Sequence, residues 1–284
     1  MKSRPVLFGA CTVGLLAAHA HVLRALVEFA LENPTASHIL AVPFITLALI
    51  VEDRKAILAS VRPARVAGAA VILVGLAPLL ASSLLGEPRP DSSLSLSACG
   101  LVVSWIGLFL FVYGVEAARV AFFPLAFLSF MIPIPLLLID GATSALKAAS
   151  TQTVAGLFTI TGTPYYREGF VFSLPTFVIE VADRCSGIRS SIALVLTCLV
   201  VGHVSLRSWW SKVLLVLIAM PVAVFKNGVR IVTLSLLAMH WNPSFLVGRL
   251  HHEGGFVFFL LGLAMLTPVL AALHRMEKTA RNPS

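Results

Sequence analysis

The stretch Val213-Leu-Leu-Val-Leu-Ile-Ala-Met-Pro-Val-Ala-Val-Phe-Lys-Asn-Gly-Val-Arg-Ile-Val-Thr233 carries only two charged side chains, Lys226 and Arg230. A helix of about 20 mostly apolar residues is long enough to cross the hydrocarbon core of a bilayer. The whole chain shares this character, because 58% of its 284 residues are hydrophobic and only 12% are charged. A soluble domain carries about 25% charged residues. The sequence therefore predicts an integral membrane protein.

Seven further apolar segments lie on either side of this stretch, so we expect an all-α polytopic protein with about eight transmembrane helices in one domain, residues 1–284. The second candidate is short, contains Pro43, and could begin inside the preceding loop. Residues 142–160 include Lys147 and other polar side chains, and we interpret them as an amphipathic helix at the interface. If they crossed the membrane instead, every later loop would change sides. The eight candidates are 5–22, 39–51, 66–85, 94–113, 120–139, 186–204, 213–233 and 255–273.

The formal net charge of +8 would suggest a nucleic-acid partner in a soluble protein. Here the basic residues cluster between apolar runs, so membrane topology explains them better, and we expect a lipid bilayer and no nucleic acid as the surroundings. With the N-terminus inside, twelve Lys and Arg residues fall in cytoplasmic segments and seven in outer segments. We therefore predict a multi-pass protein of the plasma (inner) membrane with both termini in the cytoplasm.

The longest stretch between the predicted spans ends in a β-hairpin signal. Aromatic and β-branched residues flank Ser173-Leu-Pro-Thr176, a pattern typical of two short strands around a proline turn. In the predicted topology this hairpin is extracytoplasmic and leads directly into Cys185.

Cys185 differs from the other three cysteines. Those three lie inside apolar runs and are expected as small buried hydrophobes, and the spacing of the cysteines does not fit a metal site, so we predict no metal or cofactor. Cys185 stands at the start of the sixth span, between Arg184 and Arg189. A helix N-terminus and nearby cations favour the nucleophilic thiolate. The local sequence supports two interpretations of Cys185 equally, as a nucleophile or as a structural cysteine.

Two other polar groups stand at span ends. Arg230 is expected close to the outer face, as a functional residue or as an arginine that reaches to the interface, with Lys226 one turn deeper. Asn227 fits a hydrogen bond between helices. His251 and His252 enter the eighth span from outside, as interfacial residues or as a proton shuttle.

The predicted topology brings these groups to one face, because the sixth span starts, the seventh ends and the eighth starts outside. Spans joined by short connections tend to be neighbours. A cysteine, an arginine and a histidine can then converge as nucleophile, oxyanion-stabilising cation and proton shuttle. These are the parts of a thiol acyl-transfer site.

Four quoted stretches resemble the exosortase/archaeosortase family of membrane transpeptidases and together cover about residues 162–259. They are Gly162-Thr-Pro-Tyr-Tyr-Arg-Glu-Gly169, Val181-Ala-Asp-Arg-Cys-Ser-Gly-Ile-Arg-Ser190, Asn227-Gly-Val-Arg-Ile231 and Leu250-His-His-Glu-Gly-Gly-Phe256. The resemblance implies a thiol protease and transpeptidase that takes exported proteins with a C-terminal tail. Such a tail comprises a short motif, typically Pro-Glu-Pro-like, a hydrophobic span and a basic end.

The resemblance also assigns roles. Cys185 is implied as the nucleophile that forms an acyl-enzyme on the periplasmic face, and Arg230 as the oxyanion or substrate-positioning cation. His251 is implied as the third catalytic residue because the family's glycine follows the histidine by four, as Gly255 does here, with His252 as the alternate. Arg189 and Asn227 are expected to position the substrate.

The same residues allow two other functions. The first is a multi-spanning transporter or channel in which Lys226, Asn227 and Arg230 line an ion path. A transporter of this kind often shows paired half-repeats and several charges at mid-bilayer, and the sequence has neither. The second is an inactive family member, which the intact Cys, Arg and His set disfavours. The sequence leaves the substrate, the acceptor and the oligomeric state open.

Overall fold

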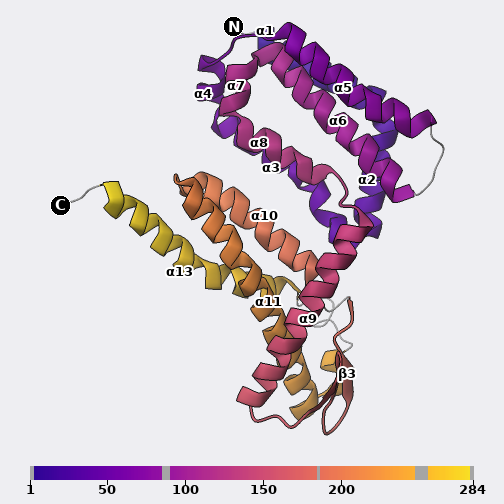
Figure 1. Ribbon diagram of the computed structural model, residues 1–284, viewed down its shortest axis with the longest axis vertical. Coiled ribbons are helices and arrows are strands. Elements are labelled where there is room, and N and C mark those ends of the chain that lie inside the picture. Colours follow the sequence, from indigo (N-terminus) through magenta and orange to yellow (C-terminus); the bar gives the residue numbers. More distant parts are fainter. Residues whose placement is uncertain (1–2, 85–89, 184–185, 247–254, 282–284) are drawn as a thin grey trace. The chain divides into compact units, whose positions relative to one another are not determined.

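The computed structural model describes residues 3–84, 90–183, 186–246 and 255–281 of the chain (Figure 1). The chain forms two compact units, Met1–Leu138 and Ile139–Ser284. Apart from one isolated β-bridge between Arg62 and Gly114, all the named elements of the first unit are helices. Its elements are α1 (Ser3–Ala18), α2 (Ala20–Glu32), the 3-10 helix η1 (Pro34–Leu40), α3 (Val42–Glu52), α4 (Arg54–Ala59), α5 (Arg65–Leu84), α6 (Pro90–Tyr113), α7 (Val115–Val120), α8 (Phe122–Phe127) and η2 (Leu128–Met131).

Helices α5 and α6 form a closely packed antiparallel pair. A Cβ atom added at Gly68 would lie 2.5 Å from the Cα of Phe111, and one added at Gly107 would lie 2.6 Å from the backbone nitrogen of Ile72. Gly75 and Gly100 face each other in the same way. In lipid, small residues drive such pairing because they allow the two backbones to approach.

The fifth predicted span, 120–139, is not one helix, and this prediction is wrong. The chain changes direction at Ala121 between α7 and α8, and η2 ends at Met131 before α9 begins at Leu136. Pro133 and Pro135 lie in this break, where they lack a backbone N–H and disfavour helix in the preceding residue. Residues 136–139 therefore belong to the following helix, and the amphipathic helix predicted over 142–160 is the later part of that helix.

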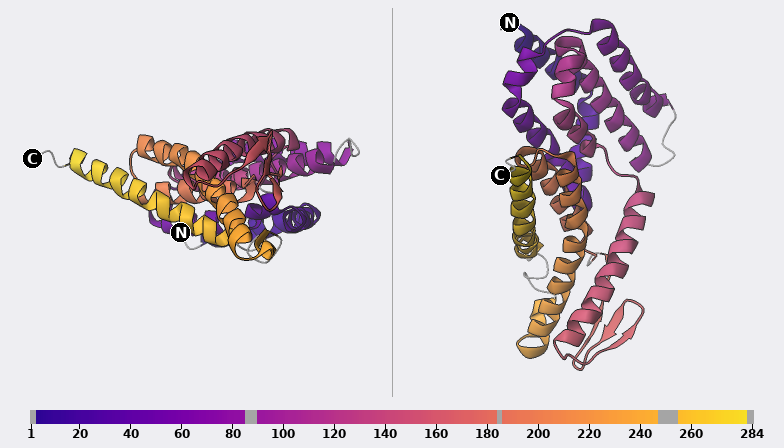
Figure 2. Two further views of the ribbon diagram at one scale, coloured as in Figure 1. Left: turned by 90° about the horizontal axis from the view of Figure 1, so that it is seen from below. Right: turned by 60° about the vertical axis from the view of Figure 1, so that its left-hand side comes forward.

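The second unit combines four long helices with a small sheet. Helices α9 and α11 run side by side in the same direction (Figure 2, right), with Ser150 beside Asn227 and Thr153 beside Gly228. Helices α10 and α13 run opposite to α11. The elements are α9 (Leu136–Ile160), β1 (Tyr166–Glu168), β2 (Val171–Ser173), β3 (Val178–Glu180), α10 (Ile188–Ser205), α11 (Trp209–His240), η4 (Pro243–Leu246) and α13 (Gly255–Arg281).

The predicted hairpin is present as β2 and β3, and the structure adds β1, giving an antiparallel sheet in the order β1-β2-β3. Phe172, at the centre of β2, is fully buried against Phe158 of α9, with ring centroids 5.7 Å apart. Arg167 of β1 donates a hydrogen bond to Gln152 of α9 at 3.1 Å. The sheet is thus fixed to α9, and it delivers the chain to the start of α10.

Five described helices are long and apolar enough to cross a membrane, or seven if each of two bent pairs is one crossing. One of these pairs is α1 and α2, which bend by 74°. The third predicted span contains a shorter apolar helix, Arg65–Ala81. The second predicted span is helical from Pro34, within the loop that precedes it. The chain is therefore an all-α multi-pass membrane protein with a short β-hairpin, as predicted, although the described residues provide five to seven candidate crossings and not eight.

Candidate functional site

The start of α10 depends on Gly187. This residue has a φ of +77°, in the left-handed region that glycine adopts most readily, and it immediately precedes the helix. The hydroxyls of Ser190 and Ser191 both donate to its carbonyl oxygen, at 3.0 and 2.9 Å. Helix α10 therefore begins at Ile188, two residues after the predicted start of the sixth span, with a tightly held first turn.

Asn227 of α11 joins three parts of the unit. Its side-chain amide donates to the Ser150 hydroxyl of α9 at 3.0 Å, and both side chains are buried. A Cβ atom at Gly187 would lie 2.8 Å from the Cγ and Oδ1 atoms of Asn227. The absence of a side chain at Gly187 thus lets the turn before α10 rest directly on Asn227. The expected hydrogen bond between helices is confirmed.

Lys226 is the neighbour of Asn227 on α11 and is only 2% exposed. Its ammonium group donates a hydrogen bond to the Ser190 hydroxyl of α10. Its aliphatic chain packs against α13, where a Cβ atom at Gly262 would lie 3.0 Å from its Cδ atom. Ser190 in turn donates to Gly187, so Lys226 supports the same turn that Asn227 contacts.

A third contact holds Asp183, four residues before Gly187. Lys147 of α9 forms an ion pair with Asp183 at 3.1 Å, and its ammonium group lies 4.5 Å from the centre of the Phe170 ring. The Lys147 side chain is 15% exposed, whereas that of Asp183 is 73% exposed. The backbone N–H of Ser186 also donates to the Asp183 carbonyl at 3.1 Å. Asp183 and Gly187 are therefore each fixed to the helices beside them.

Arg230 is half-buried on α11, three residues after Asn227. The span predicted from hydropathy ends at Thr233, whereas helix α11 continues to His240. Residues 234–240 contain no glycine or proline, and Leu234, Ser235 and Ala238 bury one face against the unit, so the helical pattern persists. Arg189 is exposed on the first turn of α10.

Cys185, His251 and His252 lie outside the described residues, as does Arg184. The convergence of Cys185, Arg230 and His251 therefore stays a prediction. Within the described ranges, no three His, Cys, Asp or Glu side chains come together as a metal ion requires.

Sequence reasoning missed the supporting residues Lys147, Ser150 and Ser190. The sequence predicts that Lys147 and Ser150, polar residues of the amphipathic segment 142–160, face the membrane interface, whereas they contact Asp183 and Asn227. Their spacing of three residues, which places both on one helical face, was the available signal. Ser190 gave no signal apart from its position in the Cys-Ser-Gly motif region.

A sequence model of the transmembrane exosortase family matches residues 30–268, which includes most of both structural units. No curated protein and no solved structure matches the sequence. The matched range contains the glycine turn before α10, the Lys226–Asn227 pair and Arg230, and it covers well over half of the chain. This chain belongs to the transmembrane exosortase family.

Proposed function

We propose that this protein is a membrane cysteine peptidase and transpeptidase that cleaves the C-terminal sorting signal, Pro-Glu-Pro-like in its motif, of exported proteins. The observation that carries the proposal is the tethering of the residues around Cys185. Asp183 is held by Lys147, and Gly187 rests on Asn227 three residues before Arg230. Cys185 stands between these two tethered positions in the sequence, two residues from each.

In the proposed reaction, the Cys185 thiolate attacks the carbonyl carbon of the scissile peptide bond. The carbonyl π electrons move to oxygen, and the Arg230 guanidinium stabilises the resulting oxyanion. Collapse of the tetrahedral intermediate breaks the C–N bond, and His251, or His252 as the alternate, donates a proton to the leaving amine. An acceptor amine or water then attacks the thioester carbonyl carbon and gives a proton to the same, now neutral, histidine. The C–S bond breaks and Cys185 leaves as thiolate, which restores the starting protonation state.

The helix arrangement supports a role for the start of α13. Gly262 lies against Lys226, and α13 runs opposite to α11. Gly255, the first residue of α13, precedes Gly262 by seven residues, or about 10 Å along the helix. Because the two helices are antiparallel, Gly255 lies level with the helical turn of α11 that follows Arg230. His251 precedes Gly255 by four residues.

Two further residues are proposed to position the substrate. Asn227 holds the turn before α10 in place, and the exposed Arg189 on the first turn of α10 contacts the substrate tail.

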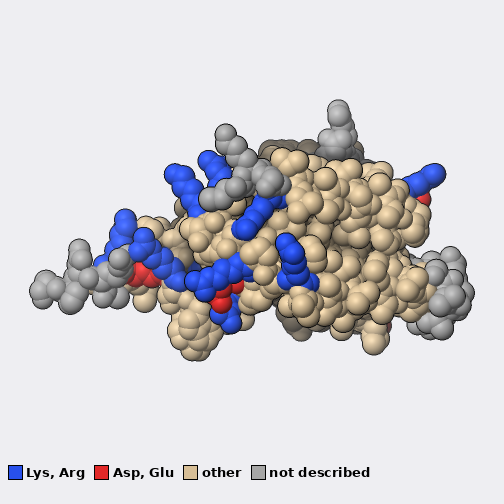
Figure 3. Space-filling model, turned by 90° about the horizontal axis from the view of Figure 1, so that it is seen from above, with Lys and Arg blue, Asp and Glu red and all other residues tan. Residues whose placement is uncertain are grey.

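We further propose that the site is extracytoplasmic and that both termini are cytoplasmic. In the second unit, Glu277 of α13 accepts hydrogen bonds from the backbone N–H groups of Arg207 and Ser208, which ties the basic end of α13 to the basic α10–α11 turn. The charged side chains visible in Figure 3 are mostly Lys or Arg. The positive-inside rule assigns the basic α10–α11 turn and the basic end of α13 to the cytoplasm, at the opposite end of α11 from His240.

The test is Cys185→Ala in the full chain, co-expressed with a substrate that carries the tail. We expect loss of processing with unchanged membrane insertion, and full processing by this variant would overturn the nucleophile assignment. A membrane-impermeant thiol reagent applied outside should label the wild-type protein and spare Cys185→Ala, whose Cys11, Cys99 and Cys198 lie within helices. Labelling that requires permeabilised cells would refute the proposed sidedness.

A further inference from the structure

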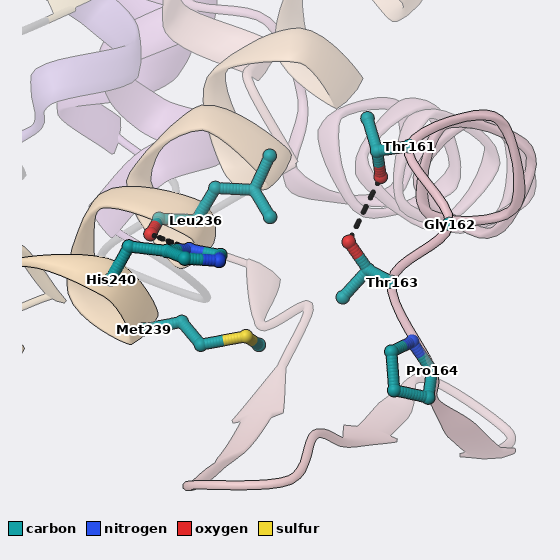
Figure 4. A pocket seen from close by; sticks show the side chains of 7 residues that line it. All are labelled: Thr161, Gly162, Thr163, Pro164, Leu236, Met239 and His240. Carbon is teal, nitrogen blue, oxygen red and sulfur yellow. Dashed lines mark hydrogen bonds between the residues drawn. The ribbon is translucent and has the colours of Figure 1, made fainter.

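A pocket of about 370 Å³ lies where α9 and α11 end, beyond Arg230 along α11 (Figure 4). Leu236, Met239 and His240 of α11 form one side. Thr161, Gly162, Thr163 and Pro164, which follow α9, form the other. The pocket belongs entirely to the second unit.

The end of α9 is built so that Thr163 faces this space. Gly162 has a φ of +66°, and the backbone N–H of Thr163 donates to the Phe158 carbonyl at 2.9 Å. This is the glycine-terminated helix end in which a left-handed residue turns the chain out of the helix. The turn carries Thr163 and Pro164 across from Met239.

The hydroxyl network leaves acceptor capacity on Thr163, a residue that lines the pocket. Thr161 donates its one hydroxyl proton to the carbonyls of Leu157 and Phe158, at 3.0 and 3.1 Å. In the 3.0 Å contact between the two threonine hydroxyls, Thr163 is therefore the donor. Its remaining lone pairs can accept an N–H group, while Leu236, Met239 and Pro164 supply an apolar surface. An acceptor beside an apolar wall suits a peptide, with a backbone N–H and a neighbouring apolar side chain.

The position on α11 sets the distance from the proposed chemistry. Leu236 and Met239 follow Arg230 by six and nine residues, or about 9 to 14 Å along the helix. An extended peptide advances about 3.3 Å per residue. A substrate residue about three or four positions from the scissile bond would therefore reach the pocket.

We propose that this pocket is a specificity subsite that binds one apolar residue of the exported protein's sorting motif, three or four positions from the bond that is cleaved. The inference rests on the proposed function, because Arg230 marks the reacting end of the peptide. Thr163 accepts a backbone N–H of the peptide, and Met239 packs on the side chain, since its flexible thioether adapts to irregular apolar surfaces.

The experiment measures binding separately from catalysis. Full-length Cys185→Ala protein in detergent is titrated with a fluorescein-labelled peptide that spans the Pro-Glu-Pro motif and its flanking residues, and anisotropy gives Kd. Adding Met239→Trp, which fills the pocket, should raise Kd about tenfold, as expected when an apolar subsite loses its occupant. Met220→Trp, on an exposed part of the same helix, is the matched control and should leave Kd unchanged.

A second measurement tests the position. In a series of peptides, the side chain at one position near the scissile bond is enlarged in each. Met239→Ala should improve the binding of only one of these peptides, the one enlarged three or four residues from that bond. Thr163→Val should weaken binding of every peptide by a similar factor. Equal Kd values for Met239→Trp and Met220→Trp, or no position-specific gain with Met239→Ala, would overturn the subsite. Tight, pocket-dependent binding without cleavage by the wild type would instead refute the proposed function alone.

Discussion

Replacing Gly187 by alanine perturbs the turn before α10 in two separable ways. Alanine at a φ of +77° enters the left-handed region, which costs an L-residue about 1 to 2 kcal/mol. Its Cβ atom would also lie 2.8 Å from the Cγ atom of Asn227, a buried group, and such overpacking costs about 1 to 3 kcal/mol. We therefore expect Gly187→Ala to lose about 2 to 5 kcal/mol of unfolding free energy.

The assay is equilibrium unfolding of the purified full chain in mixed micelles, combined with processing of a co-expressed tail-bearing substrate. Gly202→Ala is the matched control on the same helix. An added Cβ atom there meets its nearest neighbour, Leu215, at an ordinary 3.5 Å, so stability should not fall. Because Gly187 lies two residues after Cys185, processing should decrease in Gly187→Ala at temperatures where both variants are folded.

A double-mutant cycle separates the two costs. Asn227→Ala removes the Cγ and Oδ1 atoms, the two closest to the new methyl group, and keeps only the Cβ atom at 3.2 Å, but it also removes the hydrogen bond to Ser150. Gly187→Ala should therefore cost less in the Asn227→Ala background, by about the 1 to 3 kcal/mol of the steric contact. Equal costs in both backgrounds, or a Gly187→Ala protein as stable as the wild type, would refute the contact between this turn and α11.

Three further predictions concern the supports of the site and the fold. Lys147→Met should cost at most about 1 kcal/mol of stability, because Asp183 is largely exposed, yet it should slow processing, and Lys147→Arg should restore the rate. Ser150→Ala should destabilise the protein by about 1 to 3 kcal/mol in micelle unfolding, because a buried amide loses its acceptor. Gly68→Ala should separate α5 from α6 and lower the melting temperature, and an unchanged melting temperature would contradict that packing.

The sequence by itself determined that this protein lies in a membrane, and it determined several local features. Long apolar segments with few charges indicate membrane spans, and each segment gives this indication without knowledge of its neighbours. The hairpin around Ser173-Leu-Pro-Thr176 followed from local propensity, and the residues around Cys185, Arg230 and His251 were sufficient to indicate the family.

Two helix boundaries differ from the limits of the hydropathy pattern, one because of proline and the other because of packing within the unit. Hydropathy continued from Val120 to Ile139, but Pro133 and Pro135 interrupt the helix before Leu136. At α11, length alone placed the end near Thr233, whereas contacts of Leu234 and Ala238 with the rest of the unit extend the helix to His240. A hydropathy window measures the bilayer thickness and does not register a helix that continues beyond it.

Only the tertiary structure decided which polar groups meet. Ser150 and Asn227 are 77 residues apart, and Lys147 and Asp183 are 36 apart, so no local pattern pairs them. The physical reason is that lipid and a neighbouring helix are equally apolar, so hydrophobic periodicity does not specify which helices pack together or in which register. Close packing at Gly187 against Asn227, and at Gly228 against Thr153, fixes that register.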